Sequence, residues 1–515
     1  MLFRRGLMLI VAAGFLMVAG LLEGQAAGGQ GQLGAADFRP SAEQPVGWRG
    51  DGTGRFPDAA PPLAWGLKKD GSATNILWQS EMPYYSPSSP IVVGDRLFTT
   101  ANAYSLVCVD TANGKILWVR SVSPYDAATK EERAAHKEVF DQLDALALKR
   151  DELNAKIPAA PADGVFKLGQ EVFKVEEQME KLICDSDKEK YRKTGMSYSD
   201  GGYMAATPAS DGTCVYAWNG WGVTACFDLK GERKWIRFDQ IKPQEHGHFS
   251  APLLIGEKVI IYIGRQFLAL DKATGAEVWR SPYFVTAADW SGYWYGSHIK
   301  TQIGGEDVIV AGDGSLVRVR DGERFVKGEV HQGAPAPLIA GDQVVWIDGP
   351  MPPGFRAYRL PEKVDSPFAP RIQKHTFEPK DGGFMQSSPL FVDGLLYVLG
   401  SNPILYVFDV AANQQVYSQR LDFGELPKRA DRPYGCGICG SPALAGGKVF
   451  ITGNFGTTLI LEPGREYKEI GRNTIEKHFP YDWKPDMLEG FSSNAWFQGN
   501  RMYYRAQKYL YCVGG

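Results

Sequence analysis

The sequence predicts an all-β fold made of one unit that repeats along the chain. Each copy opens at a dipeptide that usually ends in proline and continues as short alternating strands, and three copies close with Asp, Gly and Trp. The opening dipeptides are Ser89-Pro90, Thr207-Pro208, Ala251-Pro252, Ala336-Pro337, Ser388-Pro389 and Ser441-Pro442. The closing run is clearest at Asp110–Trp118, Asp228–Trp235 and Asp271–Trp279. Because one small sheet cannot bury both of its faces alone, the copies must pack on one another.

Eight copies can be counted, and the last of them is incomplete. They span residues 88–122, 205–239, 249–283, 296–325, 334–377, 386–421, 440–475 and 492–513. The last copy stops after its third strand, whereas an extra strand, Asn75–Ser80, precedes the first copy. Pairing of these two ends would close a ring and leave no long sheet edge open. The prediction is therefore an eight-bladed β-propeller over residues 75–515, closed by its N- and C-terminal strands.

The closing run Asp-x-x-x-Gly-x-x-x-Trp, as in Asp271–Trp279, resembles the tryptophan-docking repeat of pyrroloquinoline-quinone (PQQ)-like propellers, which are WD40-like in architecture. That family includes quinoprotein alcohol dehydrogenases and the outer-membrane assembly protein BamB. The resemblance implies that tryptophans join neighbouring blades; the residues concerned are Trp78, Trp118, Trp235 and Trp279. A shared fold indicates little about activity, so this repeat predicts architecture rather than function.

Residues 124–199 interrupt the repeat between the first two copies. Apolar residues recur there in two runs separated by the proline- and glycine-containing stretch 158–164; they are Val139, Leu143, Leu146, Leu153 and Ile157, then Leu168, Val172, Val175, Met179 and Leu182. Arg150 interrupts the first run. The pattern predicts an antiparallel helical hairpin of coiled-coil type with charges of both signs on its outer faces. The hairpin could be a solvated decoration on the side of the propeller or a docking arm for a partner protein, and the heptads do not distinguish these.

The N-terminal residues indicate export. Residues 1–27 combine basic Arg4 and Arg5, an apolar run and a small-residue cleavage site, as signal peptides do, and an uncleaved segment would be the chain's one membrane anchor. We therefore expect a periplasmic or extracellular protein, with residues 28–74 as a linker and extended segment. Arg49-Gly50-Asp51 matches an adhesion tripeptide, but its glycine-rich surroundings favour a structural turn. The formal net charge of −3 offers no basic excess for nucleic acid.

Seven cysteines raise the question of thiol chemistry. Cys108, Cys226 and Cys512 occupy equivalent positions in their copies, where other copies have Ala, Val or Ile, so they are expected to be inert and buried. Cys214 and Cys226 are expected to face each other across a hairpin centred on Gly220, and a cross-strand disulfide there is an alternative. Cys436-Gly-Ile-Cys439 is a candidate for a local disulfide, because the chain has no second such pair to complete a zinc site.

The loops that precede the first strand of each copy carry the candidate ligand-binding residues. Asp200-Gly-Gly-Tyr-Met204 and Asp381-Gly-Gly-Phe-Met385 are near copies. With comparable loops they would line one mouth of a central channel; the candidate residues are Asp200, Tyr203, His246, His248, Trp290, His298, Asp381 and Phe384. A small molecule or a peptide could bind there, or the residues could simply shape and fill the loops. No metal site is predicted, although His246, His248 and His298 are the residues that could form one.

The resemblance also suggests an enzyme as the alternative. It implies a vicinal disulfide that stacks on PQQ, together with a Ca²⁺ site, but this chain has no Cys-Cys dipeptide. No acidic residue has the spacing of a calcium ligand or a general base. The sequence therefore predicts an exported module that binds a protein or peptide, with no catalytic residues. A PQQ- and Ca²⁺-dependent quinoprotein oxidoreductase is the alternative.

Overall fold

The computed structural model describes residues 31–191, 202–241, 248–284, 295–329, 335–347, 353–424, 440–481, 484–488 and 490–515, and Gly31–Gly515 is one compact unit. The expected signal segment, 1–27, lies outside the described residues. No helix in the described ranges combines the length and apolarity needed to cross a membrane.

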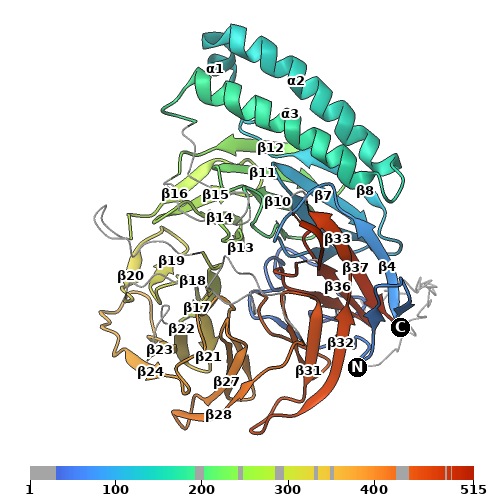
Figure 1. Cartoon of the computed structure of the whole chain (residues 1–515). Coiled ribbons are helices and arrows are strands. Elements are labelled where there is room, and N and C mark those ends of the chain that lie inside the picture. Colours follow the sequence, from blue (N-terminus) through green and yellow to red (C-terminus); the bar gives the residue numbers. More distant parts are fainter. Residues whose placement is uncertain are drawn as a thin grey trace, which may run out of the picture. The chain divides into compact units, whose positions relative to one another are not determined.

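Consecutive strands pair antiparallel into sheets of four, so the all-β prediction is confirmed (Figure 1). Sheet 1 contains β5 (Ile91–Val93), β6 (Arg96–Ala101), β7 (Ser105–Asp110) and β8 (Ile116–Ser121). Sheet 2 contains β9 (Ala209–Ser210), β10 (Cys214–Trp218), β11 (Val223–Asp228) and β12 (Arg233–Phe238). Sheet 3 contains β13 (Leu253–Ile255), β14 (Lys258–Tyr262), β15 (Phe267–Asp271) and β16 (Glu277–Arg280). Sheet 4 contains β17 (Ile299–Ile303), β18 (Glu306–Val310), β19 (Leu316–Arg318) and β20 (Arg324–Val326).

The second half of the chain continues in the same way. Sheet 5 contains β21 (Leu338–Ala340), β22 (Gln343–Ile347), β23 (Gly354–Arg359) and β24 (Gln373–Thr376), and sheet 6 contains β25 (Leu390–Val392), β26 (Leu395–Leu399), β27 (Ile404–Asp409) and β28 (Gln414–Arg420). The core of sheet 7 is β29 (Ala443–Ala445), β30 (Lys448–Thr452), β31 (Thr457–Leu461) and β32 (Glu469–Ile475). Strands β33 (His478–Tyr481) and β34 (Lys484–Leu488) form a separate pair. Middle strands such as β7 and β27 are buried on both faces, because each sheet packs between two others.

The last sheet combines both ends of the folded unit. Sheet 8 contains β35 (Trp496–Gln498), β36 (Arg501–Arg505) and β37 (Tyr509–Gly514), and its fourth strand is β4 (Ile76–Glu81). In this antiparallel pair Cys512 lies opposite Trp78 and Tyr509 lies opposite Glu81. The fourth strand of this sheet is therefore supplied from more than 400 residues upstream.

Hydrogen bonds between the residues that open each sheet link successive sheets. The main-chain N–H of one such residue donates to the side chain of the next; the pairs are Ser89 to Thr207, Ala251 to Ser297, Ala336 to Ser388, Ser388 to Ser441, Ser441 to Asn494 and Asn494 to Ser89, at 2.9 to 3.1 Å. Ala251 and Ala336 have no side-chain acceptor, so the two remaining links of this kind cannot form. The Asn494 link joins sheet 8 to sheet 1, and β4 of sheet 8 leads along the chain into β5 of sheet 1.

The segment expected to be a linker is instead packed against the sheets, which corrects that part of the prediction. Strand β1 (Arg55–Phe56) adds parallel to β29, and β2 (Gly66–Leu67) adds parallel to β32 and is followed by β3 (Ala73–Thr74), so sheet 7 has seven strands. Phe38, Val46, Phe56 and Trp65 are buried. The many glycines of this stretch permit tight turns rather than a flexible chain.

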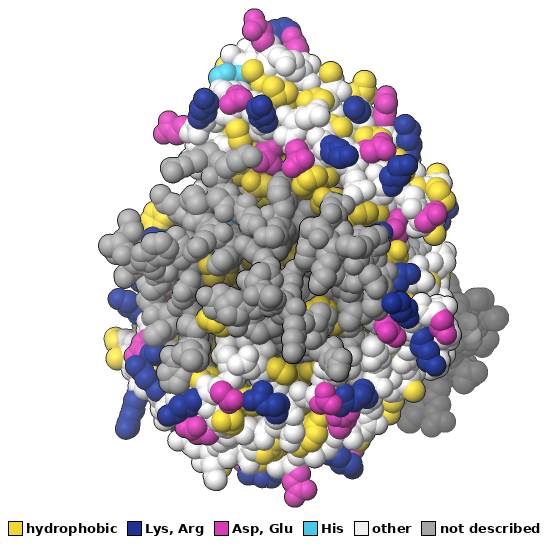
Figure 2. All heavy atoms as spheres, viewed as in Figure 1, with side chains coloured by type: hydrophobic (Ala, Val, Ile, Leu, Met, Phe, Trp, Pro, Cys, Tyr) yellow, Lys and Arg dark blue, Asp and Glu magenta, His cyan; other side chains and the backbone are white. Residues whose placement is uncertain are grey.

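The residues predicted to form a hairpin do form helices. They are α1 (Lys130–Ala135), α2 (Lys137–Lys156), the 3-10 turn η1 (Ile157–Ala159) and α3 (Val165–Ser186). Thr129 and Glu132 form a reciprocal capping box that starts α1. Helices α2 and α3 lie side by side, and α2 contacts the outer strand β8 (Figure 1). Figure 2 shows cationic and anionic side chains interspersed over the described helices in that view.

Candidate functional site

The four predicted docking tryptophans lie between consecutive sheets. Each indole N–H donates to a main-chain carbonyl of the following sheet; the pairs are Trp78 to Thr111 (3.1 Å), Trp118 to Leu229 (3.3 Å), Trp235 to Lys272 (2.8 Å) and Trp279 to Val319 (2.8 Å). Each ring covers a glycine of that sheet, where an added Cβ would come within 2.5 to 2.9 Å of the indole; these are Gly114, Gly231, Gly275 and Gly322. The Gly and Trp of one repeat therefore contact different neighbours: the glycine packs under the tryptophan of the preceding sheet, and the tryptophan packs on the glycine of the following sheet.

Tyr203, a candidate ligand residue before sheet 2, is buried in an aromatic stack. Its ring lies 5.6 Å from Tyr104 and 5.4 Å from Trp221, centroid to centroid. Burial raises the pKa of Tyr203 far above its ordinary value. This side chain packs the end of sheets 1 and 2 and does not face an open cavity.

Two of the candidate histidines also serve packing. His298 contacts the rings of Tyr262 and Phe267 edge-on at 4.7 Å each, and burial lowers its pKa to about 3. His248 is buried against the edge of Trp218. His248 lies four residues before Pro252, the proline that opens its sheet. Met204 and Met385 lie at the same distance from the opening prolines of their sheets, and both methionines are buried. Aligning the repeats at this position would have indicated an apolar site from sequence alone.

The near-copy loop before sheet 6 is at the surface. Asp381 is exposed and lies 2.8 Å from the guanidinium of Arg420, while Phe384 is half-buried and its N–H donates to Ser401. The other candidates, Asp200, His246, Trp290, Cys436 and Cys439, lie outside the described residues. Within the described ranges, no three His, Cys, Asp or Glu side chains form a group that could hold a metal ion.

The candidate residues that the structure describes do not form a site that fits PQQ or Ca²⁺. Tyr203, His248 and His298 are enclosed by protein side chains, and the carboxylate of Asp381 is already paired with Arg420.

The thiols occupy packing positions. Cys108, Cys226 and Cys512 are buried and free, as predicted, and burial raises the pKa of Cys108 to about 12. The expected pairing of Cys214 with Cys226 is wrong: Cys214 lies opposite Asp228, and Cys226 lies opposite Tyr216. The turn runs through Asn219–Val223 and is centred one residue later than expected, so the two free thiols are diagonal neighbours.

Helix α3 lies over the ends of sheets 8, 1 and 2. The hydroxyl of Tyr104 donates to Glu180 at 2.8 Å, and the N–H of Phe166 donates to Glu81 at 2.8 Å. An added Cβ at Gly169 would lie 1.6 Å from the carbonyl oxygen of Pro83, so only glycine permits this approach of helix and loop. The hairpin is therefore seated by specific contacts, and we call the α2 and α3 residues and the loops beneath them the hairpin seat.

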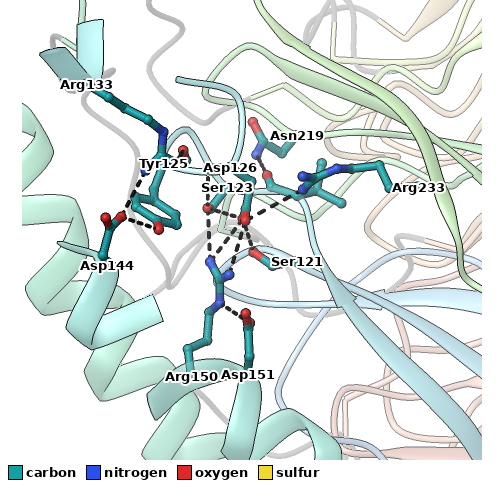
Figure 3. Close-up of polar contacts among 11 residues, drawn as sticks. Ser121, Ser123, Tyr125, Asp126, Arg133, Asp144, Arg150, Asp151, Asn219 and Arg233 are labelled. Atoms are coloured by element: carbon teal, nitrogen blue, oxygen red, sulfur yellow. Dashed lines mark hydrogen bonds and ion pairs between the residues drawn. The ribbon is translucent and has the colours of Figure 1, made fainter. Parts of the chain in front are cut away.

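An ion pair anchors α2 to the turn that leads from β8 into the hairpin (Figure 3). Arg150 reaches Asp126 with both terminal nitrogens, at 2.9 and 3.1 Å, and only 2% of the Arg150 side chain is exposed. The hydroxyls of Ser121 and Ser123 donate to the same carboxylate. Burial alone raises the pKa of Asp126, but Arg150 and the two hydroxyls together lower it below its ordinary value. Arg150 interrupts the heptad pattern of apolar residues, and this interruption was the sign in the sequence of the buried ion pair.

The N-terminal segment 45–56 crosses the ends of several first strands. Val46 and Ser210 exchange main-chain hydrogen bonds of 2.8 Å, and β1 pairs with β29. Arg49 donates to the carbonyls of Pro389 (2.9 Å) and Pro442 (2.6 Å), so the Arg-Gly-Asp tripeptide is a structural turn in which Arg49 and Gly50 are buried and Asp51 is exposed. The cavity beneath this segment, about 40 Å³, offers room for roughly one or two water molecules.

No family model and no curated protein sequence matches the chain. Among solved structures, it is similar to BamB from Moraxella catarrhalis, with 13% identity over 59% of this chain and 83% of that chain and a TM-score of 0.41. It is also similar to quinohemoprotein alcohol dehydrogenase from Comamonas testosteroni (10% identity, 85% and 76% covered, TM-score 0.47) and to the computationally designed protein Ika8 (9% identity, 86% and 100% covered, TM-score 0.48). The repeated four-stranded antiparallel sheets, with tryptophans docked between them, are those of a β-propeller. These likenesses concern the fold alone.

The propeller leaves outer strands at the ends of its sheets. Strands β12, β16, β24 and β28 end their sheets and are half-buried or exposed along their length. On sheet 3, Val278 of β16 is 49% exposed and Tyr283, which follows this strand, is 54% exposed. An outer strand with apolar side chains in solvent is suited to pairing with another chain.

Proposed function

We propose that this chain is an exported, eight-bladed propeller that binds an extended peptide segment of a partner protein along the outer edge of β16. The eight sheets and the β4–β37 pair support closure of the ring by the two ends of the folded unit. Residues 1–27 would direct export, and Edman sequencing of the mature protein that begins near residue 28 would support this part.

One observation carries the binding proposal: sheet 7 already takes in extended segments at both of its edges. Strand β1 adds to the inner strand β29, and β2 adds to the outer strand β32. The sheets of this protein thus accept additional strands through main-chain hydrogen bonds. The outer edge of β16 offers the same main-chain N–H and C=O groups. Val278 and Tyr283 would contact apolar side chains of the added segment.

The test uses fluorescent eight-residue peptides with alternating β-branched and polar residues, titrated into the purified protein. We expect saturable binding that Val278→Lys and Tyr283→Lys each weaken about tenfold, because a charge replaces an apolar contact. Leu148→Lys, at an exposed apolar position on α2, is the matched control and should bind as the unmodified protein does. Absence of peptide binding would contradict the proposal, and quinone absorbance after addition of PQQ and Ca²⁺ would favour the oxidoreductase instead.

A further inference from the structure

The hairpin seat contains more buried carboxyl groups than buried cations. Asp126, Glu176 and Glu180 are each at most about a tenth exposed, and Arg150 is the buried guanidinium near Asp126 and Glu176. Arg150 is already engaged by Asp126 through two hydrogen bonds and by Asp151 through its Nε. The carboxylate of Glu180 accepts a hydrogen bond from the hydroxyl of Tyr104. Glu176 is left without an equivalent partner.

Glu176 is enclosed on every side. It lies on α3 with 1% of its surface exposed, and neither carboxylate oxygen has a hydrogen-bond partner among the described residues. The main-chain N–H groups of Ala103 and Tyr104 face it from the β6–β7 turn without forming hydrogen bonds of good geometry. A buried carboxylate without a partner is strongly destabilising, so such a group holds a proton.

We propose that the docked hairpin binds one proton at Glu176 and that docking of the hairpin on the propeller weakens as that proton is lost. The proposal goes beyond the binding function of β16 and does not depend on it. In the docked state the carboxyl is neutral and its burial is tolerated. When α3 lifts from the β6–β7 turn, water reaches Glu176 and the carboxyl ionises.

The charged groups around Glu176 act in opposite directions. The pKa of Glu176 is raised to about 8: burial raises it most, Asp126 also raises it, and Arg150 and the main-chain N–H groups of Ala103 and Tyr104 lower it. The other titratable groups of the seat are Glu180 and Cys184 on α3, Tyr104 on the β6–β7 turn, Tyr203 before β9, Asp151 on α2 and Arg233 on β12, whose guanidinium lies 3.6 Å from Asp126.

The direction of the pH effect follows from the two pKa values. Glu176 titrates near 8 when docked and near its ordinary value of 4.5 when exposed to water. Between these values the docked state binds one proton more, so docking weakens by about tenfold for each unit that the pH rises. Above about pH 8 both states have lost the proton, and the dependence ends.

Hydrogen exchange of the full chain tests this, with rates corrected for the intrinsic effect of pH and with β14–β15 of sheet 3 as an internal reference. Between pH 5.5 and 7.5 we expect the protection of α3 amides to fall by up to about 100-fold relative to the reference. Glu176→Gln should abolish this slope whatever its overall stability, because the amide does not titrate. Glu177→Gln, at the adjacent exposed position, should retain the slope.

Two results would overturn the proposal. One is protection of α3 in the unmodified chain that stays constant relative to sheet 3 over this pH range. The other is a slope in Glu176→Gln that equals that of the unmodified chain, which would assign the proton to another group.

Discussion

Arg150 in the hairpin seat and Arg49 in the N-terminal segment are both buried, yet they are satisfied in different ways. Arg150 pairs with a carboxylate, and despite its burial its pKa is raised. Arg49 donates to two carbonyls, its Nε has no partner among the described residues, and burial lowers its pKa to about 9, opposed by Asp51. One arginine is therefore held by charge, whereas the other links two sheets by hydrogen bonds to their main chains.

We expect the largest loss of stability where the counterion of a buried arginine is removed. Asp126→Asn should destabilise the protein by about 3–5 kcal/mol, because it leaves Arg150 as a buried charge without its main partner. Chemical denaturation measures this loss. The double variant Asp126→Asn/Arg150→Met should lose less stability than the sum of the losses of Asp126→Asn and Arg150→Met, since neither charge is then left alone. Additive losses would contradict the ion-pair account of the seat.

A smaller loss of stability is expected when Arg49 is replaced. Arg49→Met removes no ion pair but leaves the carbonyls of Pro389 and Pro442 without their donor, which should cost about 1–3 kcal/mol. Thermal unfolding of this variant beside Asp126→Asn would measure the difference between the two arginines. A loss at Arg49 equal to that at Asp126 would show that the carbonyl contacts are as strong as the ion pair.

The smallest effect is expected where a single neutral hydrogen bond is removed. Ser441→Ala takes away the acceptor for the Ser388 N–H and makes this link resemble those at Ala251 and Ala336, so we expect a loss of about 1 kcal/mol. The denaturation midpoint checks this value, and Ser72→Thr, at an exposed turn, should leave it unchanged. A loss as large as that of Arg49→Met would mean that this link is essential to the order of the sheets.

Much of the fold was predictable because it depends on local periodicity. Alternating strands and heptads indicated the sheets and the helical hairpin, and the Gly-Trp spacing indicated docking between sheets. The N-terminal segment was not predictable, because its partners are distant: Arg49 and Pro442 are 393 residues apart, and the glycine-rich composition is also that of a linker. Loop residues such as Tyr203 and His298 were read as ligand-binding because composition alone does not show which side chains the hairpin and neighbouring sheets enclose.

The proposed closure of the propeller depends on β4 completing the sheet of the C-terminal strands. A photo-crosslinking amino acid at Leu77, a 46% exposed position that contacts Gly514, tests it directly by mass spectrometry of the monomer. The account predicts a crosslink within one chain to the peptide that contains β36 or β37. Crosslinks only between chains, or to a different sheet, would contradict it.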